Sequence, residues 1–203
     1  MFKEHKKIYI QQEESYKKSG LVYSIHSNGK VIGTLQETEK YSKKVWNQFI
    51  KLFNLFFLAP NLMVIEKVEL QLVDEEGKVL GTIEKGVGFN NDLILYTSSG
   101  EQLAVVKSNV KMKSPSMTVT DAKGNELLQA KSSYGAIDFL VCESVTSKHI
   151  SSISKRSLVY ETIKENFLNN DVYHIENSDL DEHITFSLIA MGVAIDIYFH
   201  VGQ

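Results

Sequence analysis

The sequence predicts a mainly β fold, a closed antiparallel barrel of about twelve strands around a hydrophobic C-terminal helix. Three observations support this prediction. Hairpin units recur along the chain, weaker strand-like runs follow them, and the final long segment is apolar on all of its faces. A flat sheet of so many strands usually curls or closes, and closure removes exposed strand edges.

The hairpin units share one form: an apolar run, a polar turn that contains Gly, and a second apolar run. The first unit, LVYSIHSNGKVIGTLQE, turns at Asn28-Gly29, and both residues tolerate the positive φ that a tight hairpin turn requires. The phrase GKVIGTLQ returns downstream as GKVLGTIE, through internal duplication or convergent hairpin chemistry. The turns of the next three units contain Gly77, Gly100 and Gly124. This pattern predicts a β-meander.

Four further runs are weaker strand candidates: Ile8–Ile10, Ala136–Val145, His149–Ser154 and Asp171–Glu176. The segment Tyr160–Asn169 is compatible with a short helix or with a loop.

The C-terminal helix is expected over about residues 183–200, HITFSLIAMGVAIDIYFH, because apolar residues occupy two lines at helical spacing. A helix that is apolar all round needs cover all round. A transmembrane helix is the alternative, but eighteen residues span roughly 27 Å against a hydrocarbon core of ~30 Å, and Asp196 lies within them. We therefore expect a helix buried in protein, with barrel backbone amides bonded to Asp196.

Acidic residues gather before this helix. Ser178 or Asp179 is the expected N-cap, and Asp181 or Glu182 follows three residues later, as a capping box requires. With Glu176 these acids also suggest calcium, but they lack the Gly and terminal Glu of an EF-hand loop, so capping is the simpler interpretation and no metal site is predicted.

A second helical segment is expected over about residues 43–59, KKVWNQFIKLFNLFFLA. Trp46, Phe49, Phe53 and Phe56 recur at spacings of three and four, which places them on one face. This helical insertion has three interpretations: a helix packed on the barrel, a membrane-surface helix, or a docking helix for a partner protein or a second copy of the chain. An aromatic stripe of this kind most often belongs to a core.

Composition narrows the remaining possibilities. The net charge of −3 removes the usual reason to expect a nucleic-acid partner, and no Pro-rich linker divides residues 1–203, so we expect one domain. The single cysteine, Cys142, excludes an intramolecular disulfide. The polar N-terminus lacks the apolar core of a signal peptide, so we expect a cytoplasmic protein that can also associate peripherally with a membrane.

The sequence contains no recognisable catalytic constellation or cofactor motif. The six histidines include no pair at the four-residue spacing of helical metal sites, and Gly86 and Gly88 lack the third glycine of a dinucleotide site. No nucleophile-elbow sequence is present. We therefore expect neither an enzyme nor a bound cofactor.

Basic residues suggest an anion or lipid-headgroup site. Three lysines in VVKSNVKMKSP would alternate along an extended segment, and four more basic residues follow downstream. An ordinary solvated strand face is the alternative interpretation. The residues concerned are Lys107, Lys111, Lys113, Lys131, Lys148, Lys155 and Arg156.

Two motifs together resemble a known superfamily. They are D-x-x-G-x-x-L-G-x-I at Asp74–Ile83 and AxxxAID at Ala190–Asp196, and the combination is similar to tubby C-terminal domains, phospholipid scramblases and LURP-one-related proteins, most of all to small bacterial members. The resemblance implies a twelve-strand barrel threaded by its C-terminal helix, and a non-enzymatic module that binds lipid or acts in signalling. This chain departs from the pattern, with Arg156 as its single arginine and no calcium loop or cysteine cluster.

The expected function is therefore binding at an anionic phospholipid or membrane surface, with residues 43–59 as an apolar anchor and lysines as the charge. The alternative is a protein-interaction scaffold that docks a partner, or forms a homodimer, through the same aromatic segment. An unrecognised enzyme is the third possibility.

Overall fold

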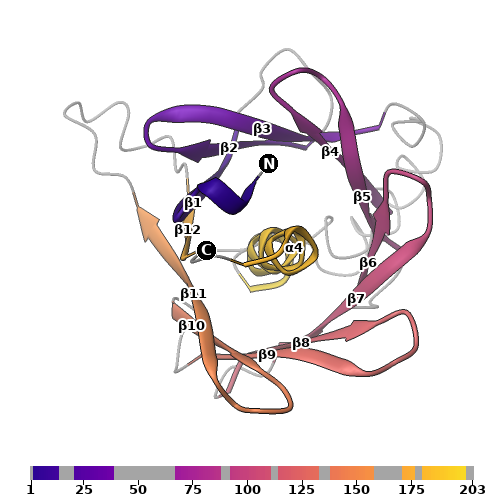
Figure 1. The fold of residues 1–203 in the computed structure, drawn as a ribbon, viewed down its shortest axis with the longest axis vertical. Helices are drawn as coiled ribbons and strands as arrows, with labels where there is room; N and C mark the ends of the chain where they lie inside the picture. Colours follow the sequence, from indigo (N-terminus) through magenta and orange to yellow (C-terminus); the bar gives the residue numbers. More distant parts are fainter. Residues whose placement is uncertain are drawn as a thin grey trace, which may run out of the picture.

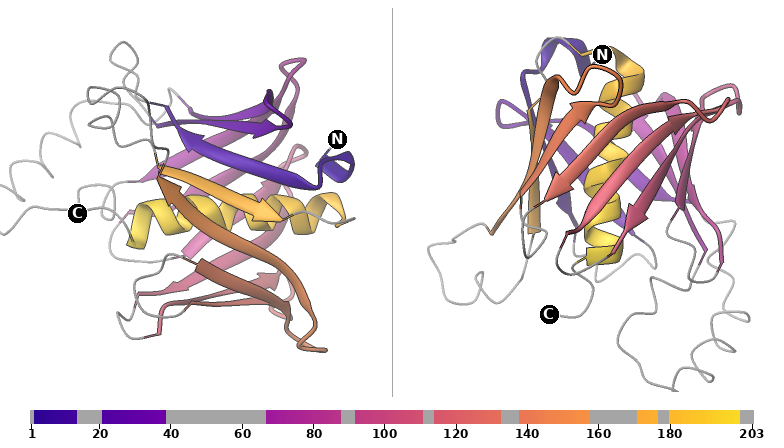
Figure 2. Two further views of the ribbon diagram at one scale, coloured as in Figure 1. Left: turned by 90° about the vertical axis from the view of Figure 1, so that its left-hand side faces the viewer. Right: turned by 90° about the horizontal axis from the view of Figure 1, so that it is seen from below.

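The computed structural model describes residues 2–13, 21–38, 67–87, 92–110, 114–132, 138–157, 171–176 and 180–199. Within these ranges twelve strands form one closed barrel, and helix α4 (Glu182–Phe199) lies inside it (Figures 1 and 2). A short 3₁₀ helix, η1 (Phe2–Glu4), precedes the first strand. The strands are β1 (Lys7–Gln12), β2 (Val22–Ser27), β3 (Lys30–Glu37), β4 (Val68–Asp74), β5 (Val79–Lys85), β6 (Asp92–Thr97), β7 (Gln102–Asn109), β8 (Ser116–Asp121), β9 (Glu126–Ser132), β10 (Asp138–Glu143), β11 (His149–Ser157) and β12 (Asp171–Glu176).

Each strand pairs antiparallel with its neighbours in sequence, and β1 closes the barrel by pairing with β12. At this seam Ile8 lies opposite Ile175 and Ile10 lies opposite Tyr173. The predicted class, a mainly β closed barrel of about twelve strands around a C-terminal helix, is confirmed.

The hairpin turns form where the Gly residues predicted them. Asn28 and Gly29 have φ values of 51° and 75°, and Gly77, Gly100 and Gly124 also have positive φ. The five hairpins from β2–β3 to β10–β11 each contain one register shift, which lies two or three residues before the turn. Such bulges increase the local bend and twist of a strand, so this repeated feature helps the sheet to close.

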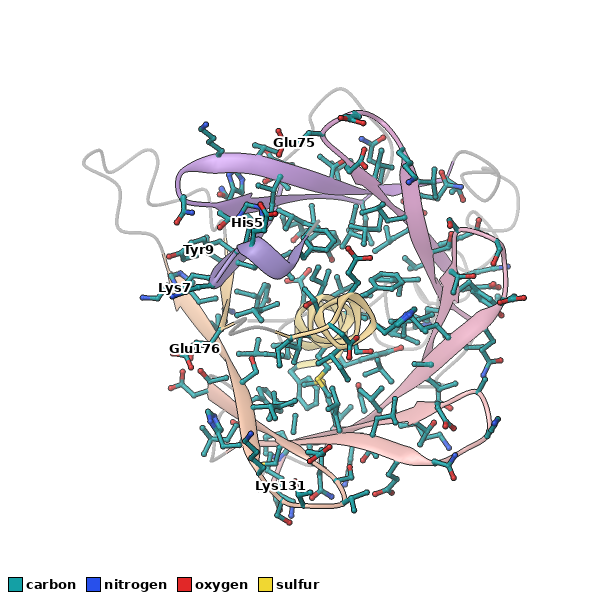
Figure 3. The ribbon with its side chains drawn as sticks, viewed as in Figure 1. His5, Lys7, Tyr9, Glu75, Lys131 and Glu176 are labelled. Atoms are coloured by element: carbon teal, nitrogen blue, oxygen red, sulfur yellow. The ribbon has the colours of Figure 1, made fainter. Side chains whose placement is uncertain are left out.

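The core forms between the inner face of the barrel and α4. Burial alternates along the strands, and every residue of α4 from Thr185 to Tyr198 is buried. Side chains fill the space between helix and strands (Figure 3). By length and composition α4 could cross a membrane, but 78% of it is buried inside the barrel.

Two glycines allow α4 to approach the wall closely. A Cβ at Gly81 would lie 2.7 Å from Cε1 of Phe186 and 2.7 Å from the Tyr96 carbonyl oxygen, and a Cβ at Gly192 would lie 2.9 Å from Cδ1 of Ile10. The second glycine of the repeated GKVLG phrase is therefore a packing requirement at β5.

Most predicted boundaries agree with the structure to within a few residues. The C-terminal helix was expected at 183–200 and spans Glu182–Phe199, while β1 is longer than the expected Ile8–Ile10. The predicted segments 43–59 and Tyr160–Asn169 lie outside the described residues.

Candidate functional site

The two ends of the barrel differ. At one end, here called the turn end, lie the five hairpin turns, η1 and the start of α4 (Figure 2). We call the other end the loop end. It contains the end of α4, the end of β3 at Glu37 and the start of β4 at Val68. Val68 pairs with the end of β5. The connection that contains the predicted aromatic segment therefore leaves and rejoins the barrel at the loop end.

Two of the predicted basic residues share one outer face near the loop end. Lys107 on β7 lies opposite Thr118 of β8, and Lys131 on β9 lies opposite Ser116 of the same strand. Residues two apart on a strand point to the same side, so both exposed lysines flank β8 on the outside of the barrel, where Figure 3 labels Lys131. Strand spacing places their Cα atoms about 12 Å apart.

Neighbouring side chains complete this surface. Leu140 of β10 lies opposite Lys131 and is 59% exposed, whereas Asp92 of β6 lies opposite Lys107. We use the name basic face for Lys107, Ser116, Thr118, Lys131 and Leu140. It combines two cations, two hydroxyl groups and one exposed apolar side chain, and the carboxylate of Asp92 borders it opposite Lys107.

The remaining predicted cations do not join the basic face within the described residues. Lys155 lies opposite Tyr173, whose side chain points into the barrel, so the expectation that Lys155 contributes to an outer face was wrong. Lys148 follows the β10–β11 turn at the opposite end, so that expectation was wrong too. Arg156 lies on β11, but its side chain is outside the described part of the chain, as are Lys111 and Lys113 and the aromatic residues Trp46, Phe49, Phe53 and Phe56.

Asp196 forms polar contacts between α4 and the barrel. The hydroxyl of Tyr23 donates to its Oδ2 and the hydroxyl of Tyr173 donates to its Oδ1, each at 2.8 Å. Burial raises the pKa of Tyr23 well above its ordinary value of 10.0, and the charge and hydrogen bond of Asp196 raise it further. We expected backbone amides as partners, and this was wrong because the strand amides are engaged in the barrel ladder.

A second buried charge was missed by the sequence reasoning. Lys85 is 0% exposed because it ends the inward-facing series Gly81, Ile83 and Lys85 on β5. Its Nζ donates to the Gly86 carbonyl oxygen at 3.0 Å. The strict alternation in GTIEK was a sufficient signal to place this lysine inside.

One group of side chains, on β2 and directly after β1, resembles part of a catalytic arrangement. Ser24 donates to Oε1 of Glu13 at 2.5 Å, and Nε2 of His26 lies 2.7 Å from Ser24 Oγ. Since Ser24 gives its only proton to a carboxylate, Nε2 of His26 must be the donor in the second contact. A serine nucleophile needs the opposite direction, with the imidazole accepting the hydroxyl proton, so this arrangement does not activate Ser24.

The start of α4 is capped by Asp181. Its Oδ1 accepts hydrogen bonds from the backbone amides of His183 at 2.8 Å and Ile184 at 2.9 Å. The prediction of an N-cap at Ser178 or Asp179 was therefore wrong, because Asp181 itself occupies the position before Glu182. No group of three His, Cys, Asp or Glu side chains placed to hold a metal ion occurs within the described ranges.

Comparison with known proteins supports the fold alone. No protein-family model matches the chain, and no curated protein matches it in sequence. A similar solved structure is that of the Arabidopsis thaliana protein AT5G01750, which is 12% identical with a TM-score of 0.51, over 94% of this chain and 91% of that one. The fold is thus of the tubby-like barrel class.

Proposed function

We propose that this protein is a non-enzymatic binding module that associates with anionic membrane surfaces at the loop end of its barrel. The observation that carries the proposal is the shared outer face of Lys107 and Lys131, with exposed Leu140 beside Lys131. Cations beside an apolar contact suit a surface of anionic headgroups above acyl chains.

The magnitudes require a second attachment. Each lysine near an anionic leaflet contributes about 1 kcal/mol, so two lysines give at most about 2 kcal/mol, and the carboxylate of Asp92 opposite Lys107 lowers this contribution. The connection between β3 and β4, which contains residues 43–59, leaves and rejoins the barrel at the loop end, and the aromatic stripe predicted there would add the apolar part of the interaction. This division of roles predicts that either contribution alone binds weakly.

We also infer that the chain belongs with the small bacterial LURP-one-related and scramblase-like proteins, as a cytoplasmic member. The motifs at Asp74–Ile83 and Ala190–Asp196 favour this assignment, and both motifs have a structural role in the barrel. The first contains the β4–β5 turn and Gly81, which packs closely against α4. The second contains Gly192 and the buried Asp196.

The experiment compares the wild type with a variant carrying Phe49→Ser and Phe53→Ser in co-sedimentation with vesicles. Vesicles of phosphatidylcholine alone and of phosphatidylcholine with phosphatidylserine separate apolar from charge-dependent binding. We expect the wild type to pellet only with the anionic vesicles and the variant to remain soluble. If the folded wild type does not bind anionic vesicles at low salt, the proposal is overturned. If the wild type self-associates and the variant does not, the scaffold alternative is favoured.

A further inference from the structure

A pocket of about 260 Å³ opens at the turn end of the barrel, away from the basic face. It lies between the hairpins β4–β5 and β6–β7, with α4 and η1 forming its other walls. We propose that this pocket binds a small zwitterionic amphiphile, with an apolar body about the size of one aromatic ring and both an ammonium and a carboxylate group. The proposed membrane function neither uses nor requires it.

The floor of the pocket is apolar and well supported. Phe186 of α4 is 5% exposed, and Phe2 and Leu72 are buried beside it, while the half-buried Leu80 and Leu103 line the pocket and pack against the core. Gly81 fixes the position of Phe186, because a side chain there would overlap the Phe186 ring. The floor is therefore a preformed apolar surface, which lowers the entropic cost of binding.

The volume limits the ligand. An engineered apolar cavity of about 150 Å³ accepts benzene, and pockets for drug-sized molecules begin at about 300 Å³. A pocket of about 260 Å³ therefore accommodates one ring or a branched chain with a small polar head.

The rim carries charges of both signs. Lys78 follows the β4–β5 turn, Glu182 begins α4, and both are exposed at the mouth of the pocket. A ligand with a single charge is attracted to one of these groups and repelled by the other. A zwitterion can place its carboxylate near Lys78 and its ammonium group near Glu182. Thr97, Ser98 and His183 add groups that can hydrogen-bond to either head.

The probes are L-phenylalanine, 3-phenylpropionate and 2-phenylethylamine, which share one ring and differ in the charge of the head. Binding is followed at low salt by the methyl NMR signals of Leu80 and Leu103. We expect L-phenylalanine to bind with a Kd of about 1 mM or below, and each singly charged probe to bind at least about fivefold more weakly. The proposal would be overturned if none of the probes shifts the Leu80 and Leu103 signals. It would also be overturned if 3-phenylpropionate binds as tightly as L-phenylalanine.

Two variants locate the site. Ser98→Trp places a large side chain over the mouth from an exposed turn position, so we expect it to abolish binding while the protein stays folded. Lys78→Gln should weaken phenylalanine and phenylpropionate but not phenylethylamine, whereas Lys123→Gln, in the turn of β8–β9, should change nothing. Unaltered binding in a folded Ser98→Trp variant would contradict the assignment of this pocket.

Discussion

The hydroxyl of Tyr23 donates a 2.8 Å hydrogen bond to Asp196, although 173 positions separate the two residues in the chain. Tyr173 donates to the other carboxylate oxygen, so one side chain of α4 bonds to both β2 and β12. Since β1 lies between these strands, Asp196 ties the helix to the seam where the first and last strands close the barrel. Closure of the sheet and insertion of the helix are thus coupled by one buried carboxylate.

This coupling predicts that Tyr23→Phe destabilises the protein by about 2 kcal/mol, because a hydrogen bond to a charged group contributes about 1.5–3 kcal/mol. Urea unfolding measures the loss. The triple variant Tyr23→Phe, Tyr173→Phe and Asp196→Leu removes the Asp196 carboxylate together with the two tyrosine hydroxyls that donate to it. It should be more stable than the double variant Tyr23→Phe and Tyr173→Phe, in which the carboxylate stays buried without these donors. A Tyr23→Phe variant as stable as wild type would contradict the coupling.

The raised pKa of Tyr23 predicts a stability loss at alkaline pH. The folded state keeps this proton above pH 10, where the unfolded chain releases it, so the contribution is complete below the ordinary value of 10.0 and declines as pH rises above it. Burial raises the pKa of Tyr198 too, with the charge of Asp92 adding to the effect, so the loss has at least two sources. Urea unfolding between about pH 9 and pH 11 should show a smaller decline in Tyr23→Phe than in wild type.

The two close glycines should respond differently to alanine. At Gly81 the new Cβ meets the rigid Tyr96 carbonyl as well as the Phe186 ring, so Gly81→Ala should cost about 1–3 kcal/mol. At Gly192 the atom closer than 3.0 Å is the flexible end of Ile10, and alanine favours the helix by about 1 kcal/mol, so Gly192→Ala should be nearly neutral. Thermal unfolding of both variants tests this, and the reverse order would refute the packing argument.

The β8–β9 turn depends on Asp121. Its Oδ1 accepts backbone amides of Lys123 and Asn125, each at 2.8 Å, and the side-chain amide of Asn125 is the largest cause that lowers the pKa of Asp121. A lowered pKa means stability present above the ordinary value of 3.8 and lost as pH falls through the folded value. Asp121→Ala should therefore lower the melting temperature at pH 7 and lower it less in strong acid. Asp74→Ala, which removes the equivalent backbone contacts of Glu76 and Lys78 from the β4–β5 turn, is the matched comparison.

The fold was predictable because its determinants are local. Turns such as Asn28-Gly29 need positive φ, and alternation along each strand specifies which face is buried. The C-terminal helix was predictable because an all-round apolar segment has few alternatives to burial. The bulge in each hairpin was not predicted, although the extra residue is apolar in each case and breaks the alternation just after the turn. These residues are Ile32, Leu80, Leu103, Leu127 and Ile150.

The site was less predictable because it depends on contacts distant in sequence. Lys107 and Lys131 meet on one face only through the register of β7, β8 and β9. Lys155 was grouped with the other basic residues by charge alone, whereas its pairing with the inward-pointing Tyr173 directs it toward the inside of the barrel. The tyrosine partners of Asp196 lie on strands that the sequence alone could not place beside the helix.

The most direct test of the proposed membrane function is vesicle binding by a variant with Lys107→Glu and Lys131→Glu. Its control, with Lys123→Glu and Lys148→Glu, makes the same change in net charge with exposed lysines at the turn end. Across a salt series with phosphatidylserine-containing vesicles, we expect salt-sensitive binding by wild type and control, and much weaker binding by the basic-face variant. Equal binding by the two variants would contradict a specific role for the basic face.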